Sequence, residues 1–219
     1  GMEHCAHEQW VDCPYYEQLQ YAGDTRIQAL VSLWSTGDSR LMYNAIDQLA
    51  NSITPMGLTQ SRYPSNYRQL IPPFSLWWVA MVHDYWMHRT DTAFVKSFLF
   101  GIKGVLRWHQ LQLGEKGMLK DVPWWNFVDW PKEWPWDEEA RIGGVPKGGS
   151  DGTSSILNLQ YTYVLELAAQ LHEAFGETAQ ASAYREQASA IKEATYQACW
   201  DEEKGLMADT PEKTVFSQH

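Results

Sequence analysis

The segment from Leu76 to Met87 carries apolar side chains on almost every side of a helix, and this limits the folds open to the chain. A helix without a polar face must be buried on all sides. The next segment, from Asp91 to Leu113, carries a single apolar stripe instead. Its members are Phe94, Phe98, Leu99, Ile102, Val105 and Leu106. The two segments therefore predict an inner helix followed by an outer helix, and Gly114 is expected to end the second.

A second pair of helices is predicted before these segments. Apolar residues recur at positions i, i+3, i+4 and i+7 within residues 24–35, which predicts a helix that Gly37 ends. They are Ile27, Leu30, Val31 and Trp34. Asp38 is expected to cap the next helix, which Pro55 stops. The apolar face of that helix consists of Met42, Ala45, Ile46, Leu49 and Ile53.

A third pair is predicted after a long connection. Thr153 and Ser154 begin a helix that runs to Phe175, and Gly176 ends it. An alanine-rich helix follows. Its expected inward residues are Ala181, Tyr184, Ala188, Ile191 and Ala198. A short turn is expected after that helix, at Lys204–Gly205.

The spacing of the pairs predicts their arrangement. Turns within each pair are short, whereas the connections at residues 55–73 and 115–152 are long. This pattern is typical of a ring of αα-hairpins, with the long loops gathered at one end. Loops of that length in a compact domain are usually functional. The fold class is therefore all-α, and because three hairpins do not close a ring, we expect residues 1–219 to form a single partial domain.

Composition excludes some functions. The formal net charge of −10 disfavours nucleic acid as a partner. No apolar run approaches the roughly 20 residues that cross a bilayer. Three cysteines suggest neither a disulfide framework nor a metal site, and the cellular compartment is left open. Twelve tryptophans raise the hypothesis of carbohydrate binding, although composition alone favours their use in a helical core.

Residues 12–24 hold the highest concentration of potentially reactive side chains, with three carboxylates interspersed with three tyrosines. Pro14 and Gly23 indicate a loop. A sugar site needs carboxylates that accept hydroxyl hydrogen bonds, aromatic walls, and one carboxyl group that donates a proton. A polar loop with Asp24 capping the first helix explains the same residues equally well.

The order of these residues resembles the signature of the bacterial α-L-rhamnosidase family, whose catalytic domains are six-hairpin glycosidases. The matching residues are Asp12-Cys13-Pro14, Glu17 and Tyr21-Ala22-Gly23-Asp24. The resemblance implies that Glu17 is the general acid. It implies that Asp12 and Asp24 hold the sugar hydroxyls and that Tyr21 is an aromatic contact. It further implies no cofactor, and that the chain forms about half of a six-hairpin α/α toroid.

Two positions depart from the family pattern. Tyr16 stands where the family often has arginine, and Tyr21 where it often has tryptophan. These changes affect how a sugar fits and leave the acid in place. Another six-hairpin glycosidase acting on a different terminal sugar therefore stays open, as does a non-catalytic carbohydrate-binding or scaffolding helical domain.

The connection at residues 121–152 is rich in aromatic residues and glycine. Asp129-Trp130 resembles the Asp-Trp pair that lines the rhamnose site in the family, and Trp125 is expected beside it. We expect Trp134 and Trp136 to belong to a local hydrophobic cluster. The glycine pairs at 143–144 and 148–149 permit tight turns next to the site.

Other polar groups are weaker candidates. His4, His7 and Glu8 match no metal-ligand spacing, so no metal is expected. His83-Asp84 suits either contact with a substrate or a buried polar arrangement. Ser154 and Ser155 lack a nucleophile-elbow motif and are expected to start a helix.

The resulting hypothesis is hydrolysis of terminal α-L-rhamnosyl bonds with inversion. The partner would be a rhamnose-containing oligosaccharide or glycoside. We expect apolar walls and the charges of Asp12 and Asp24 to raise the pKa of Glu17. The family pattern puts the water-activating base in the second half of the domain, so this chain alone should be inactive. An uncovered apolar flank should let it self-associate.

Overall fold

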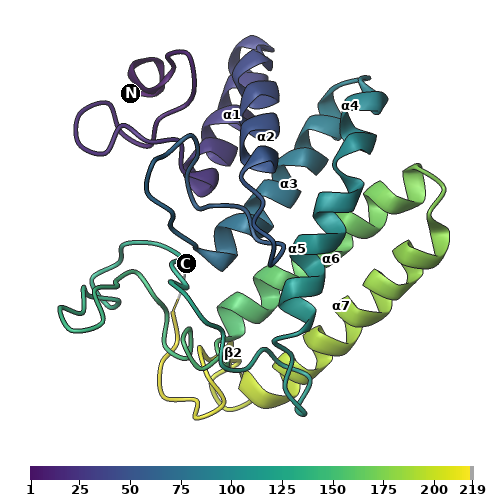
Figure 1. Cartoon of the computed structure of the whole chain (residues 1–219). Coiled ribbons are helices and arrows are strands. Elements are labelled where there is room, and N and C mark those ends of the chain that lie inside the picture. Colours follow the sequence, from purple (N-terminus) through teal and green to yellow (C-terminus); the bar gives the residue numbers. More distant parts are fainter. Residues whose placement is uncertain (218–219) are drawn as a thin grey trace.

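The computed structural model describes residues 1–217 and shows three helical hairpins packed side by side (Figure 1). The helices are α1 (Ala22–Thr36) with α2 (Arg40–Asn51), α3 (Pro72–His88) with α4 (Thr92–Ser97) and α5 (Leu99–Gln110), and α6 (Ser155–Ala174) with α7 (Thr178–Cys199). A short 3-10 helix, η1 (Met2–Cys5), precedes them, and strands β1 (Trp200–Asp201) and β2 (Leu206–Met207) follow them as an antiparallel pair. The all-α class and the three helical pairs are confirmed.

The first helices of the hairpins, α1, α3 and α6, pack against one another with α3 in the middle. α3 is buried along most of its length, as its lack of a polar face predicts, and Trp78 is completely inaccessible. The Trp78 indole N–H donates to the carbonyl of Ile46 on α2 at 3.1 Å, so even this polar atom is satisfied. α3 is therefore the central inner helix of the arrangement.

The apolar stripe that predicts α1 is not the face that packs. Ile27 and Trp34 are 67% and 71% exposed, and Val31 is also exposed. The buried residues of α1 are mostly small: Ala22, Thr25, Ala29, Ser32 and Leu33. Small side chains let neighbouring helices approach closely, so α1 packs through them. The spacing therefore predicts the helix correctly, but Ile27, Val31 and Trp34 lie on its exposed side.

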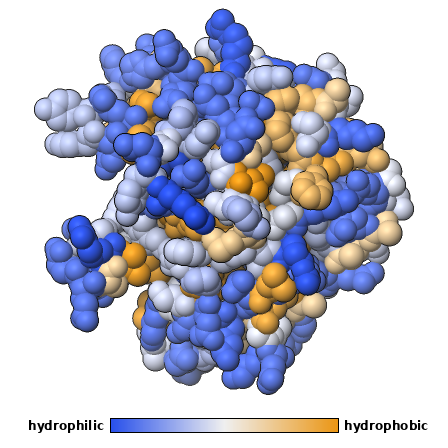
Figure 2. Space-filling model, in the orientation of Figure 1, coloured by the Kyte–Doolittle hydropathy of each residue, from blue (hydrophilic) through white to orange (hydrophobic). Residues whose placement is uncertain are grey.

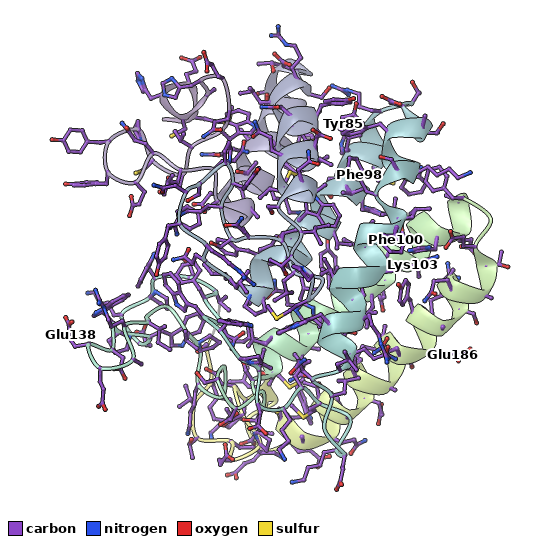
Figure 3. All side chains as sticks on the ribbon, viewed as in Figure 1. Tyr85, Phe98, Phe100, Lys103, Glu138 and Glu186 are labelled. Atoms are coloured by element: carbon purple, nitrogen blue, oxygen red, sulfur yellow. The ribbon has the colours of Figure 1, made fainter. Side chains whose placement is uncertain are left out.

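The predicted outer helix over residues 91–113 is two helices. The Asp91 carboxylate accepts the Phe94 N–H at 3.1 Å and begins α4, and the Phe98 N–H bonds back only three residues to Val95. That tight turn separates α4 from α5 at Phe98, which Figure 3 labels. α5 ends at Gln110, before Gly114. The break changes the direction of the chain, and Phe98 stays buried against Trp78.

Both long connections lie at the end of the hairpins where α1, α3 and α6 begin (Figure 1). Tyr21 contacts Phe74 at the start of α3 with ring centroids 6.1 Å apart, and Phe74 contacts Phe127 at 5.7 Å. The backbone N–H of Leu119 donates to Asn158 on α6 at 2.8 Å. These contacts gather the loops at one end, as the spacing predicts.

The polar residues in the middle of α3 each bind another inner helix. His83 bonds through Nε2 to Gln170 of α6 at 3.0 Å, and Asp84 accepts from Arg26 of α1 at 2.7 Å. The two residues therefore bind different helices and do not pair with each other, and the buried Nδ1 atom of His83 has no hydrogen-bond partner. No helix within residues 1–217 combines the length and hydropathy needed to cross a membrane.

Candidate active site

One pocket of about 530 Å³ is lined by every residue that the sequence analysis assigns to a site. Those residues are Asp12, Glu17, Tyr21, Asp24, Trp125, Asp129 and Trp130. They come from the N-terminal segment, the start of α1 and the 121–152 connection. In Figure 2 the surface is indented between the N-terminal segment and the segment that carries Glu138. The structure thus brings together side chains that lie more than 100 positions apart in the sequence.

The loop before α1 is closed at its base by Asp12. The Asp12 N–H donates to the Leu19 carbonyl at 2.9 Å, and the Leu19 N–H donates to the Asp12 carboxylate at 2.9 Å. Gln18 adopts a left-handed conformation and its side-chain amide donates to the Pro14 carbonyl at 2.9 Å. This bonding holds Glu17 at a fixed place on an otherwise exposed loop.

The Glu17 carboxylate accepts a hydrogen bond from the Cys13 thiol at 2.9 Å. This hydrogen bond is the main reason that the pKa of Glu17 is lowered, and a backbone hydrogen bond and, to a smaller extent, a hydrogen bond with Asp12 act in the same direction. The expected rise in this pKa is therefore wrong. The exposed carboxylate loses little solvation, so hydrogen bonds to its charged form dominate.

The expected rise occurs at Asp24 instead. Asp24 lies in the first turn of α1 and is partly buried, and loss of solvation raises its pKa to about 6. The nearby negative charges of Asp12, Asp129 and Glu17 raise it further, while backbone hydrogen bonding at the helix start opposes them. The pocket therefore holds a carboxyl group that takes up a proton near pH 6.

Tyr21 is fixed by contacts on both sides of its ring. Its hydroxyl accepts from Arg62 Nη1 at 2.9 Å, and its ring meets Phe74 edge-on. Burial raises the pKa of Tyr21, with smaller contributions from Asp12 and Glu17, so the phenol stays neutral. This side chain forms a firm aromatic wall next to the carboxylates.

The opposite wall is held by hydrogen bonds from the 121–152 connection. The Trp125 indole N–H donates to the Gly143 carbonyl at 2.8 Å, and Asp129 accepts the Trp130 N–H at 2.8 Å. Gly144 has φ +63°, and a Cβ there would lie 2.4 Å from the Asp129 carbonyl oxygen. Only glycine lets the backbone at position 144 approach the backbone at Asp129 so closely.

Trp134 and Trp136, in the same loop, differ in their exposure. Trp134 is buried, as expected for a local hydrophobic cluster. Trp136 is 45% exposed and lies beside Trp130 with ring centroids 6.4 Å apart. Trp136 also lies 6.4 Å from the Trp125 ring, so it belongs to a local aromatic cluster within this loop, as expected.

Several pocket residues were not anticipated from the sequence. Arg26 pairs with Asp84, donates to the Tyr163 hydroxyl at 3.3 Å and lies over the Trp77 ring at 5.0 Å. It follows Asp24 by two residues, a position from which it could have been suspected. Phe74 and Trp77 also line the pocket, but in the sequence they look like the core residues around them.

One group of side chains in the described residues 1–217 brings three metal-ligand atoms within 4.8 Å of one another, namely Asp12, Cys13 and Glu17. Each already has a partner, since the thiol bonds to Glu17 and the Asp12 carboxylate bonds to the loop backbone. His4 and His7 are not part of this group.

Residues 1–217 match the family model described as the bacterial alpha-L-rhamnosidase 6 hairpin glycosidase domain. The chain belongs to this family. A GH78 family rhamnosidase of Bacillus sp. GL1 is similar in structure, with 25% identity and a TM-score of 0.79, over 95% of this chain and 20% of that one. A search of the curated proteins finds no match.

Two further rhamnosidase structures share the fold. One, from Klebsiella oxytoca with rhamnose bound, is 21% identical with a TM-score of 0.80, over 96% of this chain and 39% of that one. The α-L-rhamnosidase from Dictyoglumus thermophilum is 14% identical with a TM-score of 0.68, over 98% of this chain and 22% of that one. This rhamnosidase-family chain thus spans between a fifth and two fifths of the length of these structures.

Proposed function

We propose that the protein containing this chain hydrolyses terminal α-L-rhamnosyl bonds with inversion, and that Glu17 is the general acid. The main support is the convergence of all seven expected site residues on one pocket within a rhamnosidase-family fold. A related protein of the same fold is described with rhamnose bound. Within this proposal, the carboxylates of Asp12 and Asp24 accept sugar hydroxyls, and Tyr21, Trp125 and Trp130 pack against the sugar, with Asp129 beside them.

The acid has to be protonated when it acts, although the pKa of Glu17 is lowered in the open pocket. A bound sugar would displace water from Glu17, and loss of solvation disfavours the ionised form. We therefore propose that substrate binding itself raises the pKa of Glu17, which suits an acid that must be protonated only in the complex.

The water-activating base is proposed to lie outside these 219 residues. In inverting glycosidases the two carboxyl groups are roughly 6.5–9.5 Å apart, which leaves room for water. The nearest carboxylate atoms of Asp12 and Glu17 lie within 4.8 Å, too close for that role. The chain alone should consequently show no turnover, and rhamnosidase activity of the pure 219-residue chain would contradict this part of the proposal.

The deciding experiment is an assay of the full-length protein on a chromogenic α-L-rhamnoside and a panel of other glycosides, with Glu17→Gln in parallel. Glu186→Gln is the matched control, because Glu186 is an exposed carboxylate on α7 that does not line the pocket and lies on the opposite side of the molecule from Glu138 in Figure 3. Rhamnoside cleavage that only Glu17→Gln abolishes supports the proposal. Glu17-dependent cleavage of another sugar would replace the substrate, and activity indifferent to Glu17 would reject the mechanism.

Self-association of the isolated chain is also proposed, through the exposed stripe of Ile27, Val31 and Trp34 on α1. Exposed apolar patches tend to associate in water. Light scattering of the chain should show oligomers that dissociate when Ile27 and Trp34 are replaced by serine. A monomer at all concentrations would reject this proposal without affecting the catalytic one.

A further inference from the structure

The Cys13 sulfur makes two contacts to the same residue, Glu17. Its thiol donates to Glu17 Oε2 at 2.9 Å, and its sulfur accepts the Glu17 backbone N–H at 3.2 Å. Cys13 therefore fixes both the backbone and the carboxyl group of one side chain. The other two cysteines, Cys5 and Cys199, are buried elsewhere and make no such contact.

The loop hydrogen bonds fix the backbone near Glu17, and the Cys13 sulfur provides the main restraint on the Glu17 side chain. The residue is exposed and belongs to an irregular loop, so its three side-chain torsions are not restricted by packing. A general acid has to place its oxygen about 2.6–3.2 Å from the atom it protonates. Misplacement of a reacting group by 1 Å can cost about a hundredfold in rate.

We propose that Cys13 is a positioning residue for the general acid. Through its S–H···O hydrogen bond, Cys13 holds the Glu17 carboxyl group toward the pocket. This inference rests on the proposed function of Glu17. The thiol donates to the ionised carboxylate, which is the form that Glu17 reaches once its proton has moved to the departing oxygen. Cys13 thus stabilises the product state of proton donation as well as the orientation of the acid.

Several titratable groups lie near Glu17, including Arg26 in the pocket lining. Cys13 and Asp12 lie in the same loop, Tyr21 and Asp24 lie at the start of α1, and Asp129 faces them across the pocket. The thiol hydrogen bond is the largest cause of the lowered pKa of Glu17. Its removal should therefore raise that pKa and move the basic limb of the kcat/KM profile to higher pH.

The test uses the full-length protein and aryl α-L-rhamnosides whose phenol leaving groups cover a wide range of pKa. A poor leaving group needs protonation and a good one does not, so impairment of the acid produces a loss that grows with leaving-group pKa. Cys13→Ala should lower kcat/KM by about tenfold to a hundredfold for the poorest leaving group, with little effect for the best. Cys13→Ser keeps a donor and should recover part of the loss.

Cys5→Ala is the matched control, because Cys5 packs on the same loop through the Asp12 carbonyl without touching Glu17. A loss in that variant should be equal for all leaving groups. If Cys13→Ala also loses activity uniformly, or leaves the pH profile unchanged, the positioning role is wrong. If Glu17→Gln itself shows no dependence on the leaving group, the proposed function fails instead, which separates the two conclusions.

Discussion

Glu17 and Asp24 face the same pocket but lie in two different kinds of backbone, and their acidities move in opposite directions. Glu17 lies on an exposed loop, where a thiol hydrogen bond lowers its pKa. Asp24 lies in the first turn of a packed helix, where burial raises its pKa to about 6. The comparison shows that hydrogen bonding decides the acidity of the exposed carboxyl group and that solvation decides the acidity of the buried one.

The difference also separates two roles. An exposed carboxyl group can change its protonation state when a ligand covers it, whereas Asp24 is already shielded before any ligand arrives. A carboxyl group that is fixed by a helix suits the binding of hydroxyls, and a group on a loop suits a change of state during the reaction. The predictions below test this division.

The largest expected effect is the loss of turnover in Glu17→Gln. In the full-length protein, this change should lower kcat on rhamnosides with poor leaving groups by roughly 10²–10⁴-fold, since it removes the proton donor. Asp24→Asn should instead act mainly on KM, with a loss that is equal for all leaving groups. If Asp24→Asn shows the leaving-group dependence and Glu17→Gln does not, then Asp24 is the acid and the division is reversed.

The next effect concerns stability and pH. Because the folded state raises the pKa of Asp24, the protonated group contributes stability that is fully present below the unfolded value near 3.8 and is lost as the pH rises through about 6. Asp24→Asn should remove this loss, with a gain of up to about 3 kcal/mol at pH 7. Thermal unfolding of both proteins between pH 4 and 8 measures this difference in stability.

Glu17→Gln is the control for that measurement and should show the opposite sign. A lowered folded-state pKa contributes stability above the unfolded value that is lost as the pH falls. The Glu17 carboxylate is exposed, so its contribution should be small. Equal pH dependence in the two variants would contradict the distinction between a buried and an exposed carboxyl group.

The wall that faces both carboxyl groups depends on Gly144. Gly144→Ala should lower the free energy of unfolding by about 2 kcal/mol, because it adds a strained positive φ and a Cβ 2.4 Å from the Asp129 carbonyl oxygen. Gly37→Ala is the matched control, since Gly37 also has a positive φ of +74° but has nothing within 4 Å of an added Cβ. Chemical denaturation of both variants should show the larger loss for Gly144, and equal losses would remove the close approach as its cause.

The sequence predicts the helices well because their apolar periodicity is strong, as in α3. It fails where packing uses other properties. The apolar stripe of α1 gives the correct period, but the helix also packs through small polar residues such as Thr25 and Ser32, which carry no apolar signal. The helix breaks at Phe98 although the apolar stripe continues through that position. A local hydrogen bond, from the Phe98 N–H to the Val95 carbonyl, produces the break.

The candidate site is predictable for a different reason. Its carboxylates and aromatic residues stand in an order that resembles a family signature, and the structure adds which of them meet. The direction of the Glu17 pKa shift could not be predicted, because it depends on a contact with Cys13 inside a loop without periodicity. Arg26 was missed because its role depends on Asp84 and Tyr163, which lie on two other helices.

The smallest expected effect concerns the aromatic wall. It tests whether a bound sugar contacts this wall as well as the two carboxyl groups. Trp130 lines the pocket and is 58% exposed, whereas Trp124 is 53% exposed but does not line it. Trp130→Ala should raise KM for a rhamnoside by roughly fivefold to tenfold, about 1 kcal/mol, since an aromatic face is lost. Trp124→Ala should leave KM unchanged, because a similar exposed ring is removed away from the carboxylates. Equal effects of the two substitutions would place the sugar outside the pocket, and the contrast between Glu17 and Asp24 would then describe the fold and not the reaction.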